Sequence, residues 1–259
     1  MHDISFPHYK NVSPATNFLI LVGALFINYV SVWLLSKSPI LAALPIALTC
    51  LSLLLYARSW KLTLVALLFA VVGAGQEAFF IANGLWNYQT VSFLLIPLYL
   101  PFTWANISIL IVGLFQGLLQ LRTALHLYHA PPHFLRAFLA TGFAALAVIL
   151  AIYHWADTPG RLVIFFLCVD LAYVFVMRSV PLAIVGLIAM AAGSVADLVA
   201  VPLGLWSYPA GGHFSGIPGY IFLGWDIVGL FAAGLYLTID LWSQTKIAAP
   251  NSQSLPSSH

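Results

Sequence analysis

Two stretches of this chain, residues 73–104 and 193–225, carry the same landmark residues in the same order. The offset between them is 120 residues, and it becomes 121 after one inserted residue. Each copy has one acid, one G-L-W-x-Y turn and one I-P-x-Y segment followed by a tryptophan. Such a duplication predicts two halves with the same fold. The matching pairs are Gly73/Gly193, Glu77/Asp197, Gly84/Gly204, Leu85/Leu205, Trp86/Trp206, Tyr88/Tyr208, Ile96/Ile217, Pro97/Pro218, Tyr99/Tyr220 and Trp104/Trp225.

The apolar composition predicts that both halves cross a membrane. Hydrophobic residues make up 62% of the chain and charged residues only 6%, whereas soluble domains carry about 25% charge. A spanning helix needs about 20 apolar residues, and the windows that reach or approach this length are 17–36, 39–57, 61–83, 93–121, 134–154, 160–177, 180–203 and 217–243. We therefore predict an all-α, polytopic transmembrane helical bundle of about eight spans, arranged as two parallel four-helix repeats. The fourth window is the longest, and we expect it to tilt or kink at Pro97 and Pro101.

The basic residues predict the orientation of these spans, because Lys and Arg are enriched in cytoplasmic loops. With the N-terminus inside, only Lys37 and Arg161 lie outside, and the cytoplasmic side holds Lys10, Arg58, Lys61, Arg122, Arg136, Arg178 and Lys246. This predicts an integral protein of the inner, cytoplasmic membrane, with both termini in the cytoplasm and both G-L-W-x-Y turns at the outer face. The predicted segments are a cytoplasmic N-terminal segment at 1–16, a first four-span repeat at 17–121, a cytoplasmic loop at 122–133, a second four-span repeat at 134–243 and a disordered tail at 244–259.

Four acidic residues fall inside predicted spans, and they are the candidate catalytic residues: Glu77, Asp170, Asp197 and Asp226. A charged carboxyl at the bilayer centre costs on the order of 3 kcal/mol, and no Lys or Arg lies in mid-span to pair with these four. Such a group can stay uncharged and act as a proton donor. The alternative is an uncharged carboxyl that only hydrogen-bonds a neighbouring helix.

The aromatic residues of the repeat are the candidate substrate-binding residues: Trp86, Tyr88, Tyr99, Trp104, Trp206, Tyr208, Tyr220 and Trp225. The G-L-W-x-Y members also suit interfacial anchors, where tryptophan and tyrosine are enriched. Trp104 and Trp225 lie further into their spans, and an indole face stabilises a cation by roughly 1–2 kcal/mol when desolvated. An aromatic cavity with an uncharged acid suits protonation of an electron-rich alkene.

The remaining motifs predict no metal site and no cofactor. His126, His129 and His133 form a weak metal box that Pro131 and Pro132 interrupt, and His213 is a single loop histidine that could relay a proton. Cys50 and Cys168 fall inside apolar runs, where small buried thiols are common. All lysines lie near span ends or in the termini, which excludes a retinal Schiff base, and no phosphate-binding glycine loop is present. The few charges favour neither a nucleic-acid partner nor an acidic one.

At the acid, G-L-W-x-Y and I-P positions, the second half resembles the integral-membrane carotenoid-biosynthesis superfamily, meaning the lycopene cyclase domain family and the related carotenoid hydratases. The lycopene cyclase domain has a Glu-Glu pair after the proline, where this chain has Gly219 and Tyr220. Trp225 is closer to the hydratase-like members, which carry a tryptophan downstream of the proline. The residues that carry the resemblance are Asp197, Gly204, Trp206, Tyr208, Gly216, Ile217 and Pro218.

This resemblance implies an integral-membrane enzyme whose substrate is a lipid-soluble isoprenoid, either a carotenoid or a terpenoid. Asp197 or Glu77 would protonate an alkene, and the aromatic residues would stabilise the cation until it cyclises or meets water. The alternative is a proton- or cation-coupled transporter, or a lipid-binding membrane protein, that uses the paired intramembrane acids. A non-catalytic membrane subunit is a third possibility. The expected partners are the isoprenoid and membrane lipids, and the sequence leaves the oligomeric state open.

Overall fold

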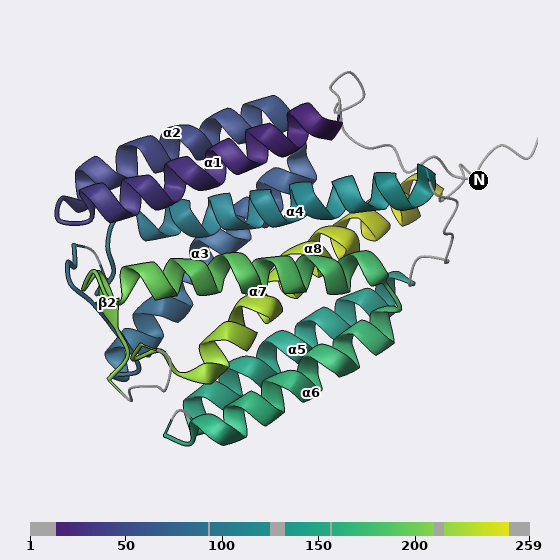
Figure 1. Cartoon of the computed structure of the whole chain (residues 1–259). Helices are drawn as coiled ribbons and strands as arrows, with labels where there is room; N and C mark the ends of the chain where they lie inside the picture. Colours follow the sequence, from purple (N-terminus) through teal and green to yellow (C-terminus); the bar gives the residue numbers. More distant parts are fainter. Residues whose placement is uncertain (1–13, 93, 125–132, 156, 210–214, 249–259) are drawn as a thin grey trace, which may run out of the picture.

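The computed structural model describes residues 14–92, 94–124, 133–155, 157–209 and 215–248. Within these residues it has eight helices that are long and apolar enough to cross a membrane, so the chain is a polytopic helical bundle (Figure 1). They are α1 (Pro14–Leu35), α2 (Pro39–Ala57), α3 (Trp60–Ala82), α4 (Leu100–Ala124), α5 (Phe134–Trp155), α6 (Pro159–Met177), α7 (Val180–Ala200) and α8 (Gly219–Ala248).

Proline and serine residues fix most of the helix starts. Proline occupies the first turn of α2, α6 and α7, where its missing N–H has no intrahelical partner to lose. The side chain of Ser59 accepts a hydrogen bond from the Leu62 amide and caps α3. These local signals explain why the span limits predicted from hydrophobicity agree with the structure to within a few residues at most helices.

The fourth span differs from the prediction. The window 93–121 was expected to be one long helix with a tilt or kink at its prolines, but α4 begins at Leu100. Leu94 and Leu95 have φ angles of 46° and 68°, which no right-handed helix accommodates. Pro101 lies in the first turn of α4, and Pro97 precedes the helix, so neither proline interrupts it.

The two halves have the same internal packing. In the first half α3 packs on α4 and α2 packs on α4, and in the second half α7 packs on α8 and α6 packs on α8. Arg58 and Arg178, which are equivalent in the repeat, end α2 and α6 in the left-handed conformation with φ angles of 46° and 50°. The pairs α1/α2 and α5/α6 lie on opposite sides of a central group formed by α3, α4, α7 and α8 (Figure 1).

The two G-L-W-x-Y segments pair with each other at one end of the bundle. Strand β1 (Asn87–Tyr88) runs antiparallel to β2 (Trp206–Ser207), with Asn87 opposite Ser207 and Tyr88 opposite Trp206. Gly84 and Gly204, each with a φ angle of 71°, allow the turns that lead into the strands. This ladder joins the repeats and positions their aromatic side chains over the central helices.

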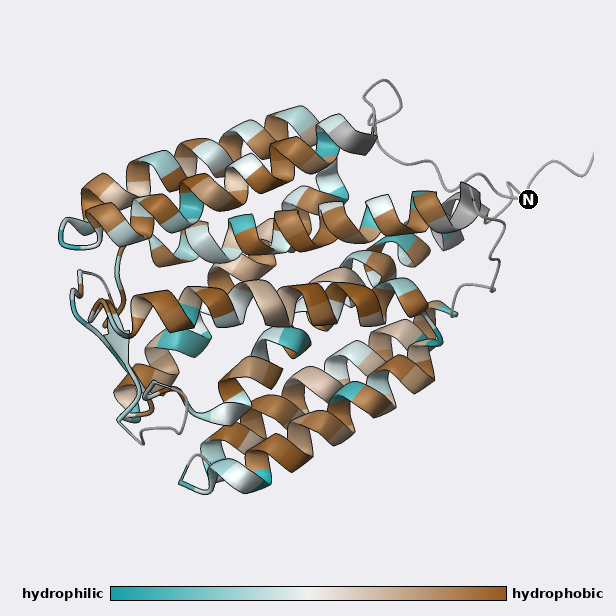
Figure 2. Ribbon diagram, viewed as in Figure 1, coloured by the Kyte–Doolittle hydropathy of each residue, from teal (hydrophilic) through white to brown (hydrophobic). Residues whose placement is uncertain are grey.

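The outer surface of the bundle is suited to lipid. The helices are predominantly hydrophobic along their lengths, and hydrophilic residues concentrate at their ends and in the connecting segments (Figure 2). Large apolar side chains such as Leu34, Val71 and Phe175 are 75%, 72% and 74% exposed. Lys61 at the start of α3 forms an ion pair of 2.5 Å with Asp240 near the end of α8. These features place the chain as an integral membrane protein.

Candidate functional site

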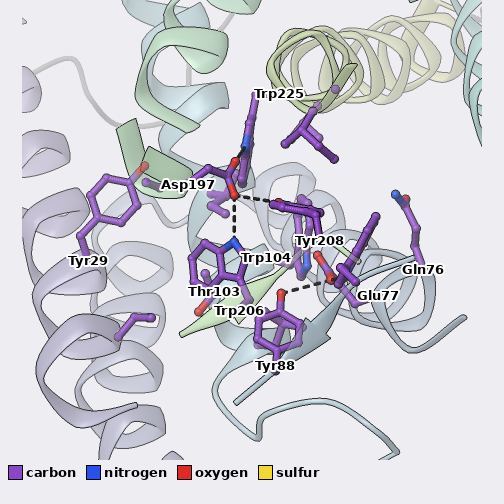
Figure 3. A pocket seen from close by; sticks show the side chains of 18 of the residues that line it. Tyr29, Gln76, Glu77, Tyr88, Thr103, Trp104, Asp197, Trp206, Tyr208 and Trp225 are labelled. Atoms are coloured by element: carbon purple, nitrogen blue, oxygen red, sulfur yellow. Dashed lines mark hydrogen bonds between the residues drawn. The ribbon is translucent and has the colours of Figure 1, made fainter. Parts of the chain in front are cut away.

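Asp197 of α7 collects three hydrogen-bond donors from its own repeat. The indole nitrogen of Trp206 donates to Oδ1 at 2.9 Å, and the Tyr208 hydroxyl donates to the same oxygen at 2.8 Å. The indole nitrogen of Trp225 donates to Oδ2 at 2.6 Å. The side chain is 1% exposed, so these three groups satisfy a deeply buried carboxyl (Figure 3).

Glu77 of α3 occupies the equivalent position and binds the equivalent turn. Its Oε2 accepts hydrogen bonds from the Trp86 indole nitrogen at 2.6 Å and from the Tyr88 hydroxyl at 3.1 Å. The indole nitrogen of Trp104 is buried and lies close enough to interact with the Glu77 carboxyl, but it makes no hydrogen bond of ordinary geometry with a described residue. The two repeats therefore build the same acid-binding turn and differ in the third donor.

The aromatic side chains of one repeat pack edge-on or tilted against those of the other. Trp86 meets Tyr208 edge-on with ring centroids 6.1 Å apart, and Tyr88 lies against Trp206 with centroids 5.8 Å apart. Burial raises the pKa of Tyr88 and of Tyr208 well above the usual value, and the neighbouring acids add to the effect. Both hydroxyls therefore stay protonated and act as donors to the acids.

Two glycines allow the deeper tryptophans to reach the centre. Trp104 and Trp225 stack with centroids 6.0 Å apart and an interplanar angle of 22°. A Cβ at Gly73 would lie 2.6 Å from the Trp104 ring, and a Cβ at Gly193 would overlap the Trp225 ring even more closely. Only glycine permits this approach of ring to helix, which explains why the repeat begins with glycine.

A central cavity of about 150 Å³ lies between the repeats. Both Glu77 and Asp197 line it, and so do all of the aromatic residues that the sequence suggested as substrate-binding. The sequence reasoning missed Tyr29, Gln76 and Thr103, which also line this cavity (Figure 3). Gln76 and Thr103 are polar residues inside apolar windows, next to Glu77 and Trp104, and that signal could have found them. Tyr29, whose hydroxyl donates to the Ala192 carbonyl at 3.0 Å, has no counterpart in the repeat.

Two mostly apolar cavities flank the central one. The α5-side cavity, of about 330 Å³, lies among α3, α4, α5, α6 and α8 and shares Gln76 and Trp104 with the central cavity. The α1-side cavity, of about 260 Å³, lies among α1, α4, α7 and α8 and shares Tyr29 and Trp225 with it. The acid-lined central cavity therefore shares lining residues with an apolar cavity on each side.

The other two candidate acids lie elsewhere. Asp170 of α6 and Asp226 of α8 are close enough to influence each other, and Asp226 packs against Gly186 of α7. Asp170 is 6% exposed, and neither of its oxygens has a hydrogen bond of ordinary geometry to another described residue. Neither acid is among the residues that line the central cavity, because both point toward the α6–α8 and α7–α8 contacts.

The histidine motifs mostly lie outside the described residues. His126, His129 and His213 belong to segments that the structure does not describe, and His133 directly precedes α5. Cys50 is buried and Cys168 is exposed, and both are free thiols. The predicted tail at 244–259 is described only as far as residue 248, where α8 ends.

Together, the fold and the site define a polytopic helical membrane protein with an internal, acid-lined cavity between two repeats. No family model and no curated protein sequence matches the chain. Among solved structures it is similar to a mycobacterial Insig homologue, MvINS from Mycobacterium vanbaalenii, with 18% identity and a TM-score of 0.55, over 70% of this chain and 94% of that one. A cross-linked MvINS trimer matches with the same values. The likeness is one of fold.

The predicted resemblance to the carotenoid-biosynthesis superfamily is wrong. The matching structures belong to an Insig homologue, and no family model supports the carotenoid proteins. The pattern that suggested them has local structural causes: Gly204 adopts a left-handed turn, Pro218 directly precedes α8, and Trp206 and Tyr208 bind Asp197. These local requirements account for the pattern in this chain, so cyclase and hydratase activities lose their support.

Proposed function

We propose that this chain is a lipid-binding membrane protein whose internal cavity holds a lipid-soluble molecule with its polar group near Glu77. The observation that carries the proposal is the central cavity, where two acids meet a wall of aromatic rings that is shared with an apolar cavity on each side. Sites for small molecules are mostly apolar and carry a few well-placed polar groups. The likeness to an Insig homologue fits a lipid-binding membrane protein better than it fits carotenoid chemistry.

The hydrogen bonds of the two acids favour Glu77 over Asp197 as the acid that meets a ligand. Asp197 accepts three donors over both of its oxygens, one of them at 2.6 Å. Asp197 is therefore engaged in holding the turn, and Glu77, with two donors on one oxygen, is the acid available to a ligand.

The site residues then divide into two groups. Trp86, Tyr88, Trp206 and Tyr208 position the acids and join the repeats through β1 and β2. Tyr99, Trp104, Tyr220 and Trp225 form the walls that contact the ligand. These walls suit isoprenoid chains as well as acyl chains, because aromatic faces pack against either. Asp170 and Asp226 have no part in the binding of the ligand.

The test is lipid analysis of the purified full chain in a mild detergent. We expect one lipid class to be enriched over the bulk membrane in the wild type and depleted in Val228→Phe, which places a larger side chain where the central and α5-side cavities meet. The control is Val71→Phe on the 72% exposed outer face, which should keep the lipid. Equal lipid content in both variants would mean that the lipid only coats the surface, and the proposal would fail.

The same preparation also tests catalysis. If the wild type releases a chemically altered lipid and Glu77→Gln releases the unaltered one, the cavity is an active site. Identical lipids from both forms support a binding protein.

A further inference from the structure

The α5-side and α1-side cavities occupy equivalent positions that are related by the repeat. Each lies between the first helix of one repeat, the third helix of the other and the two central helices α4 and α8. At an offset of 120 or 121 residues their linings correspond, as the pairs Phe18/Phe138, Gly73/Gly193 and Trp104/Trp225 illustrate. Any difference between these two cavities therefore points to what one of them does.

The first difference is the hydrogen bonding of the two tryptophans. Trp225 borders the α1-side cavity and donates its N–H to Asp197 at 2.6 Å. Trp104 borders the α5-side cavity, is 8% exposed, and its N–H makes no hydrogen bond of ordinary geometry with a described residue. Both hydrogen bonds that Glu77 accepts from described residues end on Oε2. Trp104, which lines both the α5-side and the central cavity, thus offers one donor without an ordinary hydrogen bond. Glu77 lines the central cavity, and these two bonds leave its Oε1 unused.

The second difference is size and polarity at the rim. Thr141, Gly142 and Ala145 line the α5-side cavity where bulkier leucine and valine side chains line the α1-side cavity. The α5-side cavity is accordingly larger, about 330 Å³ against about 260 Å³. On the α1 side the hydroxyl of Tyr29 is already bonded to the Ala192 carbonyl. The α5-side cavity is therefore the larger of the two, and the Trp104 N–H lies in the wall that it shares with the central cavity.

We infer that the ligand is a neutral long-chain alcohol whose apolar body lies in the α5-side cavity and whose hydroxyl joins the Trp104 N–H to Glu77. This inference rests on the proposed function and names its ligand class and its side. A hydroxyl oxygen accepts the indole hydrogen while its own hydrogen is donated to Glu77 Oε1, so one group satisfies both unused positions. The chain of the alcohol then replaces water against the apolar walls.

Other head groups do not satisfy both positions. A fatty-acid carboxylate would be repelled by Glu77 and Asp197 in a medium of low dielectric constant. A protonated amine would bind Glu77, but it has no lone pair and would leave the Trp104 N–H facing a donor. An ether or ester accepts from Trp104 but has no hydrogen for Glu77.

The test compares hexadecan-1-ol with hexadecyl methyl ether and hexadecane as competitors of a diazirine-bearing hexadecanol, which is photo-cross-linked to the purified full chain. Cross-linked residues are located by mass spectrometry. The variants are Trp104→Phe and, as a matched control on the 54% exposed end of α3, Trp60→Phe. Thermal stability is measured for each, so that a loss of binding can be separated from a loss of fold.

We expect cross-links on α3 and α5, and displacement by the alcohol at about a tenfold lower concentration than by the ether, which is the effect of one hydrogen bond. Trp104→Phe should weaken binding of the alcohol by about tenfold, and Trp60→Phe should leave it unchanged. Equal displacement by alcohol, ether and hydrocarbon, with cross-links still on α5, would overturn the alcohol but leave lipid binding intact. Cross-links on α1 would overturn the assigned side. If no residue inside the bundle is specifically cross-linked, the proposed function itself is contradicted.

Discussion

Tyr88 lies opposite Trp206 in the β1–β2 ladder, and their rings are in contact with centroids 5.8 Å apart. Each of these residues donates to a different acid, Tyr88 to Glu77 and Trp206 to Asp197. The ladder therefore ties together two carboxyls that are 120 residues apart in the sequence. Four residues of strand are enough for this, because the side chains they carry are large and their polar atoms are directed inward.

Exchanging each acid for its amide should separate their roles. In Glu77→Gln the oxygen that accepts both hydrogen bonds can remain in place, so the thermal midpoint in detergent should change little. In Asp197→Asn an N–H₂ group must face one of three donors, which costs about 1–3 kcal/mol and lowers the midpoint by about 2–4 °C per kcal/mol. Equal losses for the two variants would contradict the difference between the acids.

Adding one methyl group at Gly73 should disturb the tryptophan stack. A Cβ there would lie 2.6 Å from the Trp104 ring, and overpacking of this kind costs typically 1–3 kcal/mol. Gly75→Ala is the matched control on the same helix, since nothing lies within 4 Å of its Cβ, and it should be neutral or stabilising by up to about 1 kcal/mol. Thermal unfolding followed by tryptophan fluorescence measures both. If the Gly73→Ala protein were as stable as Gly75→Ala, the Trp104 ring would have to adopt another position without cost, and the predicted overpacking would be contradicted.

The ion pair between Lys61 and Asp240 should couple α3 to α8. The side chains are 17% and 12% exposed, so the interaction is partly shielded from solvent. In a double-mutant cycle of Lys61→Met and Asp240→Asn we expect a coupling of about 1 kcal/mol that weakens as salt is added. A coupling that is indistinguishable from zero at low salt would mean that the pair has no role in holding these helices together.

The orientation predicted from the basic residues can be tested with single cysteines. After Cys50 and Cys168 are replaced by alanine, Ser207→Cys should react with a membrane-impermeant maleimide added to the outer face of intact cells. Arg58→Cys should react only after the cells are opened, because the positive-inside rule places it in the cytoplasm. Both positions are exposed in the structure. The reverse pattern of labelling would invert the whole topology.

Much of the fold could be predicted from the sequence. The hydrophobic windows predicted the eight spans, because a helix that crosses a bilayer must be apolar along about 20 residues whatever it packs against. The error at the fourth span arose because 93–121 is predominantly apolar while Leu94 and Leu95 adopt positive φ angles. Hydrophobicity reports burial in lipid or protein, and it says nothing about whether an apolar segment before a proline is helical.

The candidate site was predictable only in part. The duplicated pattern drew attention to residues that the structure gathers around one cavity, because a repeated polar residue in an apolar span must face a partner. Tyr29 could not have been found in this way, since it comes from α1 and has no equivalent in the other repeat. The resemblance to carotenoid proteins failed because turn residues such as Gly204 are required by backbone conformation and carry no information on chemistry.

The sequence by itself determined that this protein is a duplicated membrane bundle with one acid in each copy of the repeat, since composition and spacing act locally along each helix. Only the tertiary structure decided that Trp225 donates to Asp197 while the N–H of Trp104 makes no ordinary hydrogen bond with a described residue. The two residues are equivalent in the sequence, and they differ because a hydrogen bond depends on tenths of an ångström that are set by packing between the two halves.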